Sequence, residues 1–294
     1  MGGRGTRGGP GPGTGAKNKK GAGAGTSSGA AGGGGSSAGS SGGGGKGTGS
    51  AGTGGVTGGG GSGSGGGSGG GSSINQQQTT ELKIEYGDGL TDVEKAKQQS
   101  MLDKLPEHLN KRLHETGTKL WVGTRADKTP GWAEHAKDTG VTSTTKIGDG
   151  REVGELSFYY PARNEIFISV HNPGGSVNVY VHELAHAIDY QHTGKTIGVE
   201  FPPDSGNLYS VRIISDDPYW KKLHADHIVN NTNINSYYRG GPTGKDERSG
   251  RRELFAEGFA IYNERGIIGL RGFVGSREVA DMMVEVWKRY GVVK

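Results

Sequence analysis

The sequence predicts an α+β fold: a small mixed sheet with an edge strand above one central helix, and a helical C-terminal part. Two observations support this prediction. Residues 179–190 form an apolar segment of helical period that carries an HExxH pattern. Directly before it, residues 156–160 and 165–170 are rich in aromatic and β-branched residues and flank a Pro-Ala-Arg-Asn turn. Such a pair of runs is typical of a hairpin.

The first part of the chain has a different composition. Residues 1–74 contain 37 of the 61 glycines and no acidic or aromatic residue. A segment of this kind cannot bury enough apolar surface to offset its chain entropy. We therefore expect a disordered Gly/Ser-rich arm over 1–74 and one domain over 75–294, which is long enough for a substantial core.

The arm carries six basic residues, so the remaining chain has a net charge of −2 although the whole chain has +4. Arg4 and Arg7 stand in Arg-Gly steps that allow a weak nucleic-acid contact, but a solvated linker is the favoured interpretation. The slightly acidic domain makes nucleic-acid binding unlikely. Met1 to Thr6 fit the myristoylation pattern at Gly2, a weak match in a glycine-rich segment. The absence of cysteine excludes disulfides and thiolate ligands.

The elements before the hairpin follow from start and stop signals. Asp92 is expected to cap a helix over 93–103, and Pro106 to open a second helix that ends at Gly117. Alternation in Lys119–Thr124 predicts a strand. Residues 125–150 are expected to be loop with a short strand near Val141–Ile147.

The HExxH segment contains the candidate metal-binding and catalytic residues. His182 and His186 lie four residues apart, so a helix places both imidazoles on one face, where both can bind one metal ion. Glu183 lies one position round, where it can accept a proton from an attacking water. If Ile166–Val170 is a sheet edge, an extended peptide can pair with it and reach the metal.

A catalytic zinc ion requires a third protein ligand, and two candidates remain open. His192 has metzincin spacing, but Asp189 stands where that pattern has glycine. Glu253 lies on a helix that we expect to be capped near Ser249 and stopped by Gly266. Glu257 shares the face of Glu253 and could accept an imidazole N–H from outside the metal's ligand set.

The other candidate groups are weaker. His224 and His227 are spaced i, i+3 on a further expected helix, but packed or solvated histidines are the favoured interpretation. Residues 277–290 have the apolar spacing of a core helix.

The HELAHAID segment, the ELFAEGFA segment and the YYPARNEIFISV hairpin together resemble the catalytic domain of anthrax lethal factor and its relatives, which include the Pro-Pro endopeptidases. These zinc metalloendopeptidases are gluzincins. The resemblance covers roughly residues 100–290 and implies a zincin-like fold. It implies zinc bound by His182, His186 and Glu253, with Glu183 as general base.

The resemblance also implies roles for residues near these helices. Asp189 matches an acid that commonly follows the second histidine, and with Glu257 it would support the metal site from outside the ligand set. A tyrosine ahead of the ligand glutamate stabilises the oxyanion in the family. Ser236-Tyr237-Tyr238-Arg239 carries the matching residues, and the arrangement favours Tyr237 over Tyr238, although residues 240–250 lengthen the gap to Glu253.

The expected function is zinc-dependent hydrolysis of peptide bonds, with a protein or peptide substrate bound as a strand along Ile166–Val170. The alternative is a catalytically silent zincin-fold structural or virion component with a basic flexible arm. We expect no classical signal peptide and no transmembrane segment. This interpretation slightly favours a cytoplasmic or virion-associated protein over a secreted one.

Overall fold

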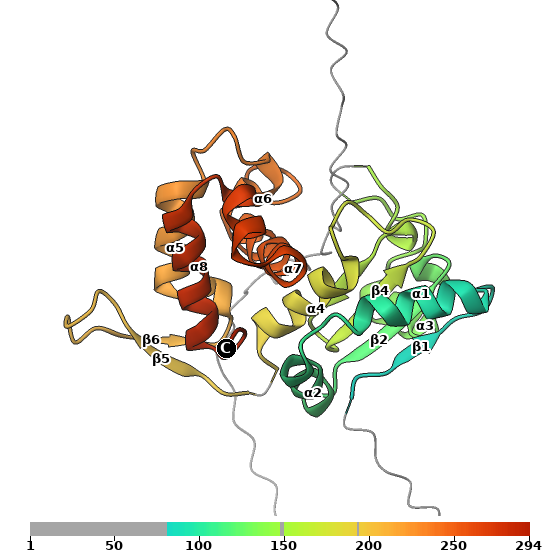
Figure 1. Cartoon of the computed structure of the whole chain (residues 1–294). Helices are drawn as coiled ribbons and strands as arrows, with labels where there is room; N and C mark the ends of the chain where they lie inside the picture. Colours follow the sequence, from blue (N-terminus) through green and yellow to red (C-terminus); the bar gives the residue numbers. More distant parts are fainter. Residues whose placement is uncertain (1–80, 148–149, 193) are drawn as a thin grey trace, which may run out of the picture.

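The computed structural model describes residues 81–147, 150–192 and 194–294 (Figure 1). The predicted arm over 1–74, with Arg4, Arg7 and the possible acylation site Gly2, lies outside the described residues. The division into an arm and a domain therefore stays a prediction. The described part combines helices with small sheets, which confirms the α+β class.

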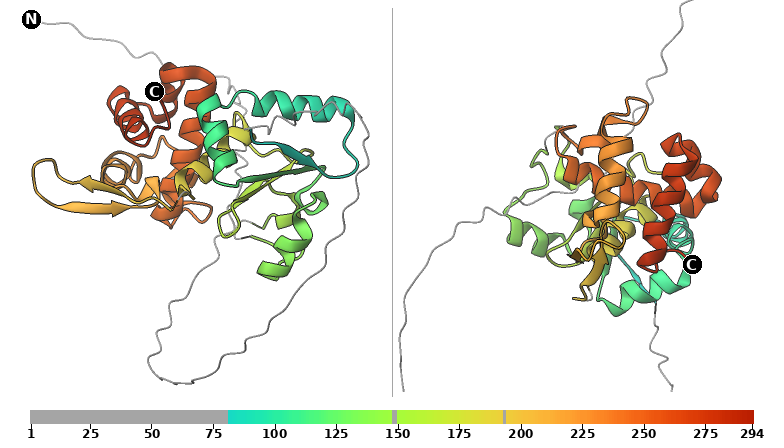
Figure 2. Two further views of the ribbon diagram at one scale, coloured as in Figure 1. Left: turned by 90° about the horizontal axis from the view of Figure 1, so that it is seen from below. Right: turned by 90° about the vertical axis from the view of Figure 1, so that its left-hand side faces the viewer.

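Helix α4, which carries the HExxH segment, lies between two parts of the molecule (Figures 1 and 2). The strands β1 to β4 and the helices α1 to α3 lie on one side of it, and the helices α5 to α8 lie on the other. The bounds are β1 (Ile84–Tyr86), α1 (Asp92–Leu102), α2 (Glu107–Glu115), β2 (Lys119–Gly123), α3 (Trp132–Thr139), β3 (Phe158–Tyr160), β4 (Glu165–Ser169), α4 (Val179–Tyr190), β5 (Ile197–Glu200), β6 (Leu208–Val211), α5 (Pro218–Leu223), α6 (Ser236–Gly240), α7 (Glu247–Val274) and α8 (Arg277–Arg289).

The four-stranded sheet corrects one prediction. Its order is β1-β2-β4-β3, so the predicted edge strand at Ile166–Val170 lies inside the sheet. Ile166 pairs with Leu120 of β2 in parallel and with Tyr159 of β3 antiparallel. The hairpin itself is confirmed, but its first strand, β3, is the outer one. The prediction was wrong because β2 pairs with β4 from far away in the chain, and no local pattern reports such a partner.

The two faces of this sheet pack against different helices. Leu120, Ile166 and Tyr159 belong to the large core that contains α4. On the other face, Phe158 and Phe167 contact the ring of His135 on α3 at centroid distances of 5.0 and 5.1 Å. The alternation of side chains along each strand explains this division. The sheet thus supports α4 from one side and leaves α7 to approach from the other.

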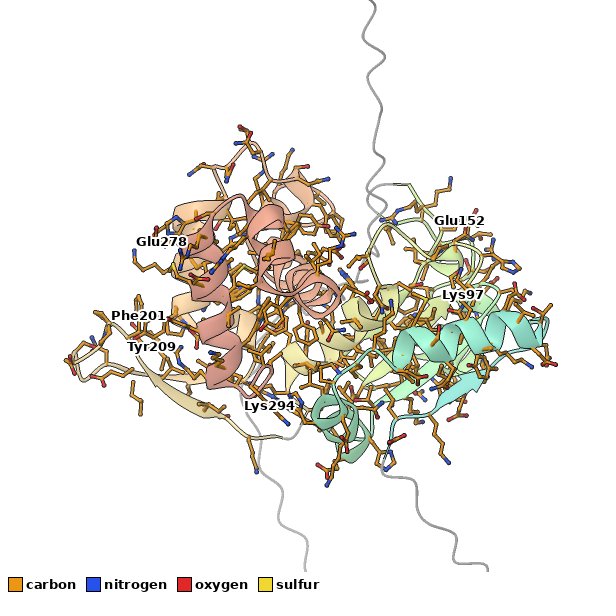
Figure 3. The ribbon with its side chains drawn as sticks, viewed as in Figure 1. Lys97, Glu152, Phe201, Tyr209, Glu278 and Lys294 are labelled. Carbon is orange, nitrogen blue, oxygen red and sulfur yellow. The ribbon has the colours of Figure 1, made fainter. Side chains whose placement is uncertain are left out.

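Several local expectations need correction. Residues 125–150 contain α3, and at the expected strand Val141–Ile147 the described residues form only an isolated bridge between Lys146 and Glu152. Thr91 caps α1 through a capping box with Glu94, in place of Asp92. The β5–β6 hairpin, which the sequence did not reveal, projects from the body with Phe201 and Tyr209 along it (Figure 3).

Helix α7 carries the candidate glutamates and is straight only over its first part. Asp246 caps it, in place of Ser249, by accepting from the backbone N–H groups of Arg248 and Ser249. Gly266 interrupts it with φ 62° and ψ −165°, so the expected stop is a break followed by more helix. A Cβ on Gly258 would meet Cε of Met283 at 2.6 Å, so this glycine permits the close approach of α8. No helix among the described residues has the length and apolarity needed to cross a membrane.

Candidate metal centre

Helix α4 places two imidazoles on one face deep in the protein. Its N-cap, Asn178, accepts from the N–H groups of Tyr180 and Val181 at 3.1 and 3.3 Å. Every residue from Val179 to Asp189 is buried, so the helix is surrounded by protein on all sides. His182 and His186 lie one turn apart, with ring centroids separated by 5.0 Å. The two imidazoles thus stand together where water is largely excluded.

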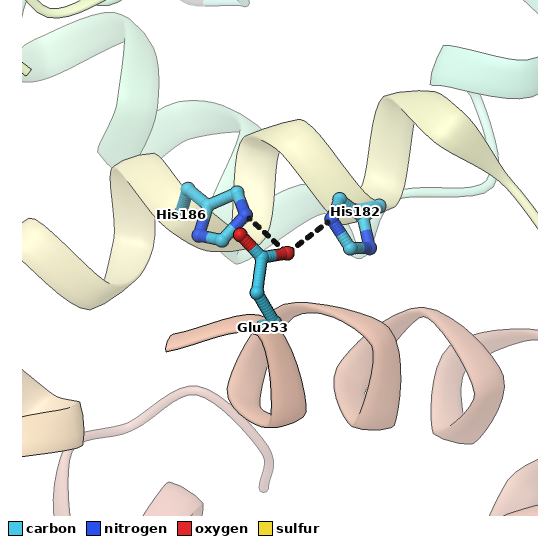
Figure 4. A group of neighbouring side chains, drawn as sticks. All are labelled: His182, His186 and Glu253. Atoms are coloured by element: carbon cyan, nitrogen blue, oxygen red, sulfur yellow. Dashed lines mark ion pairs between the residues drawn. The ribbon is translucent and has the colours of Figure 1, made fainter. Parts of the chain in front are cut away.

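Helix α7 brings Glu253 opposite these rings (Figure 4). Oε2 of Glu253 lies 3.4 Å from Nε2 of His182 and 3.5 Å from Nε2 of His186. The exposed fractions of the three residues are 1%, 2% and 2% in the order His182, His186, Glu253. Tertiary packing therefore assembles two nitrogen donors and one carboxylate oxygen from two helices.

The three atoms that converge have no hydrogen-bond partner. Nε2 of His182, Nε2 of His186 and Oε2 of Glu253 are all buried without one. Buried polar atoms are normally satisfied, so three unpartnered atoms aimed at one point require an explanation. Their ligand atoms all lie within 4.8 Å of one another. This buried group could bind a metal ion, and its imidazole and carboxylate donors suit zinc.

Glu257 holds the His182 ring from behind. Nδ1 of His182 donates to Oε2 of Glu257 at 2.9 Å. The other oxygen accepts from the backbone N–H of Val177 at 3.5 Å. When its only proton is on Nδ1, the ring presents an unprotonated Nε2 that could bind a metal ion. Such outer partners commonly orient metal-binding histidines.

The charges of the site act strongly on His182. Burial lowers the pKa of this imidazole, but the neighbouring carboxylates of Glu253, Glu257 and Glu183 outweigh burial and raise the pKa well above the ordinary value. Burial raises the pKa of Glu253, yet the two histidines outweigh that effect and lower it. Without a metal, the site therefore favours an imidazolium between carboxylates.

Asp189, one turn beyond His186 on α4, forms hydrogen bonds with Ser215. Its two oxygens accept from the backbone N–H and the hydroxyl of Ser215 at 2.6 and 2.7 Å. Burial raises the pKa of Asp189 to about 6, against the lowering effects of these bonds and of the charges of His186 and Arg252. Asp189 thus joins α4 to the turn at Ile214–Asp216 and acts on His186 through its charge. The sequence around Ser215 carries no signal for this contact.

His192 is not part of the group formed by His182, His186 and Glu253. Gln191 ends α4 in a left-handed conformation with φ 45°. The following His192 forms a hydrogen bond with the hydroxyl of Tyr159 on β3. Its ring stacks on Tyr190 at an interplanar angle of 12°. The weaker candidate His224 also has a hydrogen-bond partner, since its Nε2 lies 2.9 Å from the carbonyl oxygen of Tyr238.

The two candidate tyrosines lie on α6, which packs against α7. A Cβ on Gly250 of α7 would meet the backbone carbonyl carbon of Arg239 at 2.6 Å, so the two helices are in close contact. The rings of Tyr237 and Tyr238 form a T-shaped pair at 5.5 Å. Burial raises the pKa of Tyr238 most, and the charges of Glu257 and Glu253 raise it further. Both tyrosines lie on the helix that packs against the helix of Glu253 and Glu257.

Comparisons with known proteins give a distant structural likeness only. No protein-family model matches the chain, and no curated protein matches it significantly. Among solved structures, a Pro-Pro endopeptidase from Paenibacillus alvei is similar with a TM-score of 0.45 and 14% sequence identity. The match covers 69% of this chain and 96% of that chain.

Proposed function

We propose that this protein is a zinc-dependent metalloendopeptidase of the gluzincin type. The observation that carries the proposal is the convergence of three buried, unpartnered donor atoms from His182, His186 and Glu253. A zinc ion bound there supplies Lewis acidity toward a water molecule and a peptide carbonyl. Three protein ligands are the usual number in a catalytic zinc site.

Glu183 is the proposed general base. It follows His182 directly on α4 and is 1% exposed. A carboxylate in this position can take a proton from the attacking water and pass it to the leaving amine. The burial of the site excludes bulk water, which strengthens every charge interaction within it.

A tyrosine hydroxyl from α6 is proposed to stabilise the oxyanion. Sequence comparison within the family pattern favoured Tyr237. We propose Tyr237 first and keep Tyr238 as the alternative, because both lie on the helix that packs beside the ligand-bearing α7.

The substrate is proposed to be a protein or peptide that adds to the outer strand β3. This strand replaces Ile166–Val170, whose backbone already pairs on both sides in its first half. An extended peptide can form main-chain hydrogen bonds with an outer strand. The Tyr159 ring of β3 contacts Tyr190 of α4 at 5.5 Å, so β3 runs beside the helix that carries the histidines.

The test measures metal content and cleavage in the same samples. We expect about one zinc per chain and cleavage of a peptide library, with loss of cleavage after chelation and recovery with added zinc. His192→Ala is a matched control, because it changes a histidine of the same segment outside the metal-binding group. A folded protein that binds no zinc, or that cleaves equally well in chelator, would contradict the proposal. Zinc binding without any cleavage would favour the silent structural alternative.

A further inference from the structure

We propose that Glu264 is a positioning residue for the metal centre and acts through Asn178, the N-cap of α4. This inference rests on the proposed metal-binding function. Glu264 lies 11 residues beyond Glu253 on α7, and its carboxylate bonds to Asn178 and Lys104. Its effect on the site must therefore pass through the packing of α4 against α7.

Asn178 has a partner at both ends of its amide. Its Oδ1 accepts from the first N–H groups of α4, and its Nδ2 donates to Oε1 of Glu264 at 3.0 Å and to the carbonyl of Met101 at 3.2 Å. The residue is 1% exposed. A buried amide with all these bonds has one orientation, because a flip would set donors against donors. The cap is thus tied to α7 as well as to its own helix.

The carboxyl group of Glu264 that accepts the hydrogen bond from Asn178 is ionised. Its other oxygen, Oε2, lies 3.0 Å from Nζ of Lys104, and its side chain is 15% exposed. Burial raises the pKa of Glu264, but the bonds from Asn178 and Lys104 outweigh burial and lower the pKa. Hydrogen bonds to an ionised acceptor are stronger than neutral ones. The contact therefore links the start of α4 firmly to α7.

Three carboxylates of α7 contact α4 or the segment that leads into it. Glu253, Glu257 and Glu264 are separated by four and seven residues, which places them on one helix face. Glu253 contacts both histidines, and Glu257 contacts His182 and the N–H of Val177. Glu264 contacts Asn178. The order of these contacts shows that the two helices run antiparallel, with the metal-binding group at one end and the cap at the other.

This arrangement sets the axial register between the two helices that carry the ligand atoms. At a rise of about 1.5 Å per residue, Glu264 lies roughly 16 Å along α7 from Glu253. It lies two residues before the break at Gly266 and so holds the end of the straight part of α7. Metal–ligand distances in a well-formed site lie within about 0.2 Å of their typical values. A slip of one helix along the other would therefore weaken metal binding without removing any ligand.

The test compares variants that remove different parts of the contact. Glu264→Ala removes the acceptor, whereas Glu264→Gln keeps an oxygen for the Asn178 amide. Asn178→Ser keeps a capping oxygen for α4 and removes the amide donor. Asn263→Ala is the control at the neighbouring position, where the amide donates only to the Lys104 carbonyl. Ser276→Ala removes the N-cap of α8 and controls for a general loss of stability.

Three measurements are made on each full-length protein: zinc affinity by competition with a chelator, the visible absorption of the cobalt-substituted site, and thermal unfolding. We expect Glu264→Ala and Asn178→Ser to weaken zinc binding roughly 5- to 10-fold and to alter the cobalt spectrum. That loss is below the 10–100-fold typical of a partner in direct contact with a ligand. Glu264→Gln, Asn263→Ala and Ser276→Ala should bind zinc within about 2-fold of the unchanged protein, because they keep the amide contact. The double variant Glu264→Ala/Asn178→Ser should lose no more affinity than Asn178→Ser alone, because Asn178→Ser already removes the contact with Glu264.

Two outcomes would overturn the inference while the metal site stands. One is an unchanged protein that binds zinc tightly together with a Glu264→Ala variant that matches Asn263→Ala in affinity and spectrum. The other is a Glu264→Gln variant as weak as Glu264→Ala. An unchanged protein that binds no zinc would instead refute the proposed function.

Discussion

Nδ1 of His182 lies 2.9 Å from Oε2 of Glu257, while Nε2 of the same ring lies 3.4 Å from Oε2 of Glu253. One nitrogen of this imidazole thus bonds to a carboxylate while the other faces a second carboxylate, and the two carboxylates are one turn apart on α7. This relationship leads to separate predictions for the metal ligands, the base, the oxyanion group and the pH dependence.

The first prediction ranks three residues by their effect on zinc affinity. Glu253→Ala removes a ligand atom and should release zinc under mild chelation. Glu257→Ala should weaken binding by about 10–100-fold, as is typical of an orienting partner. His192→Ala should leave affinity unchanged, since that ring bonds to Tyr159. Zinc content and chelator competition measure all three variants in parallel. An empty site in His192→Ala with metal retained in Glu253→Ala would favour a metzincin-like site.

The second prediction concerns Glu183→Gln. Glutamine has nearly the same size but cannot accept the proton of the attacking water. We expect zinc at the level of the unchanged protein and turnover lower by at least about 10²-fold, the usual contribution of a general base. Metal analysis and peptide cleavage of the same preparation test it. Near-normal turnover would remove Glu183 from the mechanism.

The third prediction separates the two tyrosines. Tyr237→Phe removes the hydroxyl that is proposed to stabilise the oxyanion. It should lower kcat by about 10²-fold or more with little change in KM, as expected for a group that acts on the transition state. Tyr238→Phe, at the next position of the same helix, is the matched control and should stay within a few-fold of the unchanged protein. The reverse result would assign the role to Tyr238.

The fourth prediction is a pH dependence of the metal-free protein. The pKa of His182 is raised well above its ordinary value of about 6.5, so the imidazolium stabilises the fold. That stabilisation is fully present below about pH 6.5 and is lost as the pH rises through the raised pKa in the folded state. Metal-free protein should therefore unfold at a lower temperature at about pH 9 than at about pH 7. Asp189 does not contribute to this difference in unfolding temperature, because its pKa of about 6 lies below both pH values.

Zinc should reverse this trend. Binding requires a neutral His182 ring and releases its proton, so zinc affinity should rise with pH. Zinc-loaded protein should gain more in unfolding temperature at about pH 9 than at about pH 7. His182→Asn lacks the imidazole and should show neither effect. Equal stabilisation by zinc at both pH values would show that His182 holds no proton in the metal-free site.

The sequence by itself determined what depends on spacing within one element. Four-residue spacing places His182 with His186, and Glu253 with Glu257, on single helix faces in any packing. The turn at 161–164 and the β-branched runs around it specify the hairpin locally. The composition of 1–74 separates that segment from the rest of the chain, although its state stays a prediction.

Only the tertiary structure decided which of these elements meet. Pairing of β2 with β4 makes β3 the outer strand, and packing of α7 on α4 brings Glu253, not His192, to the histidines. The contacts of Asp189 with Ser215 and of Asn178 with Glu264 join residues that are 26 and 86 positions apart. Such contacts depend on the shapes and volumes of whole packed surfaces. A local sequence pattern predicts which face of a helix or strand a residue lies on, but it does not predict which other element packs against that face.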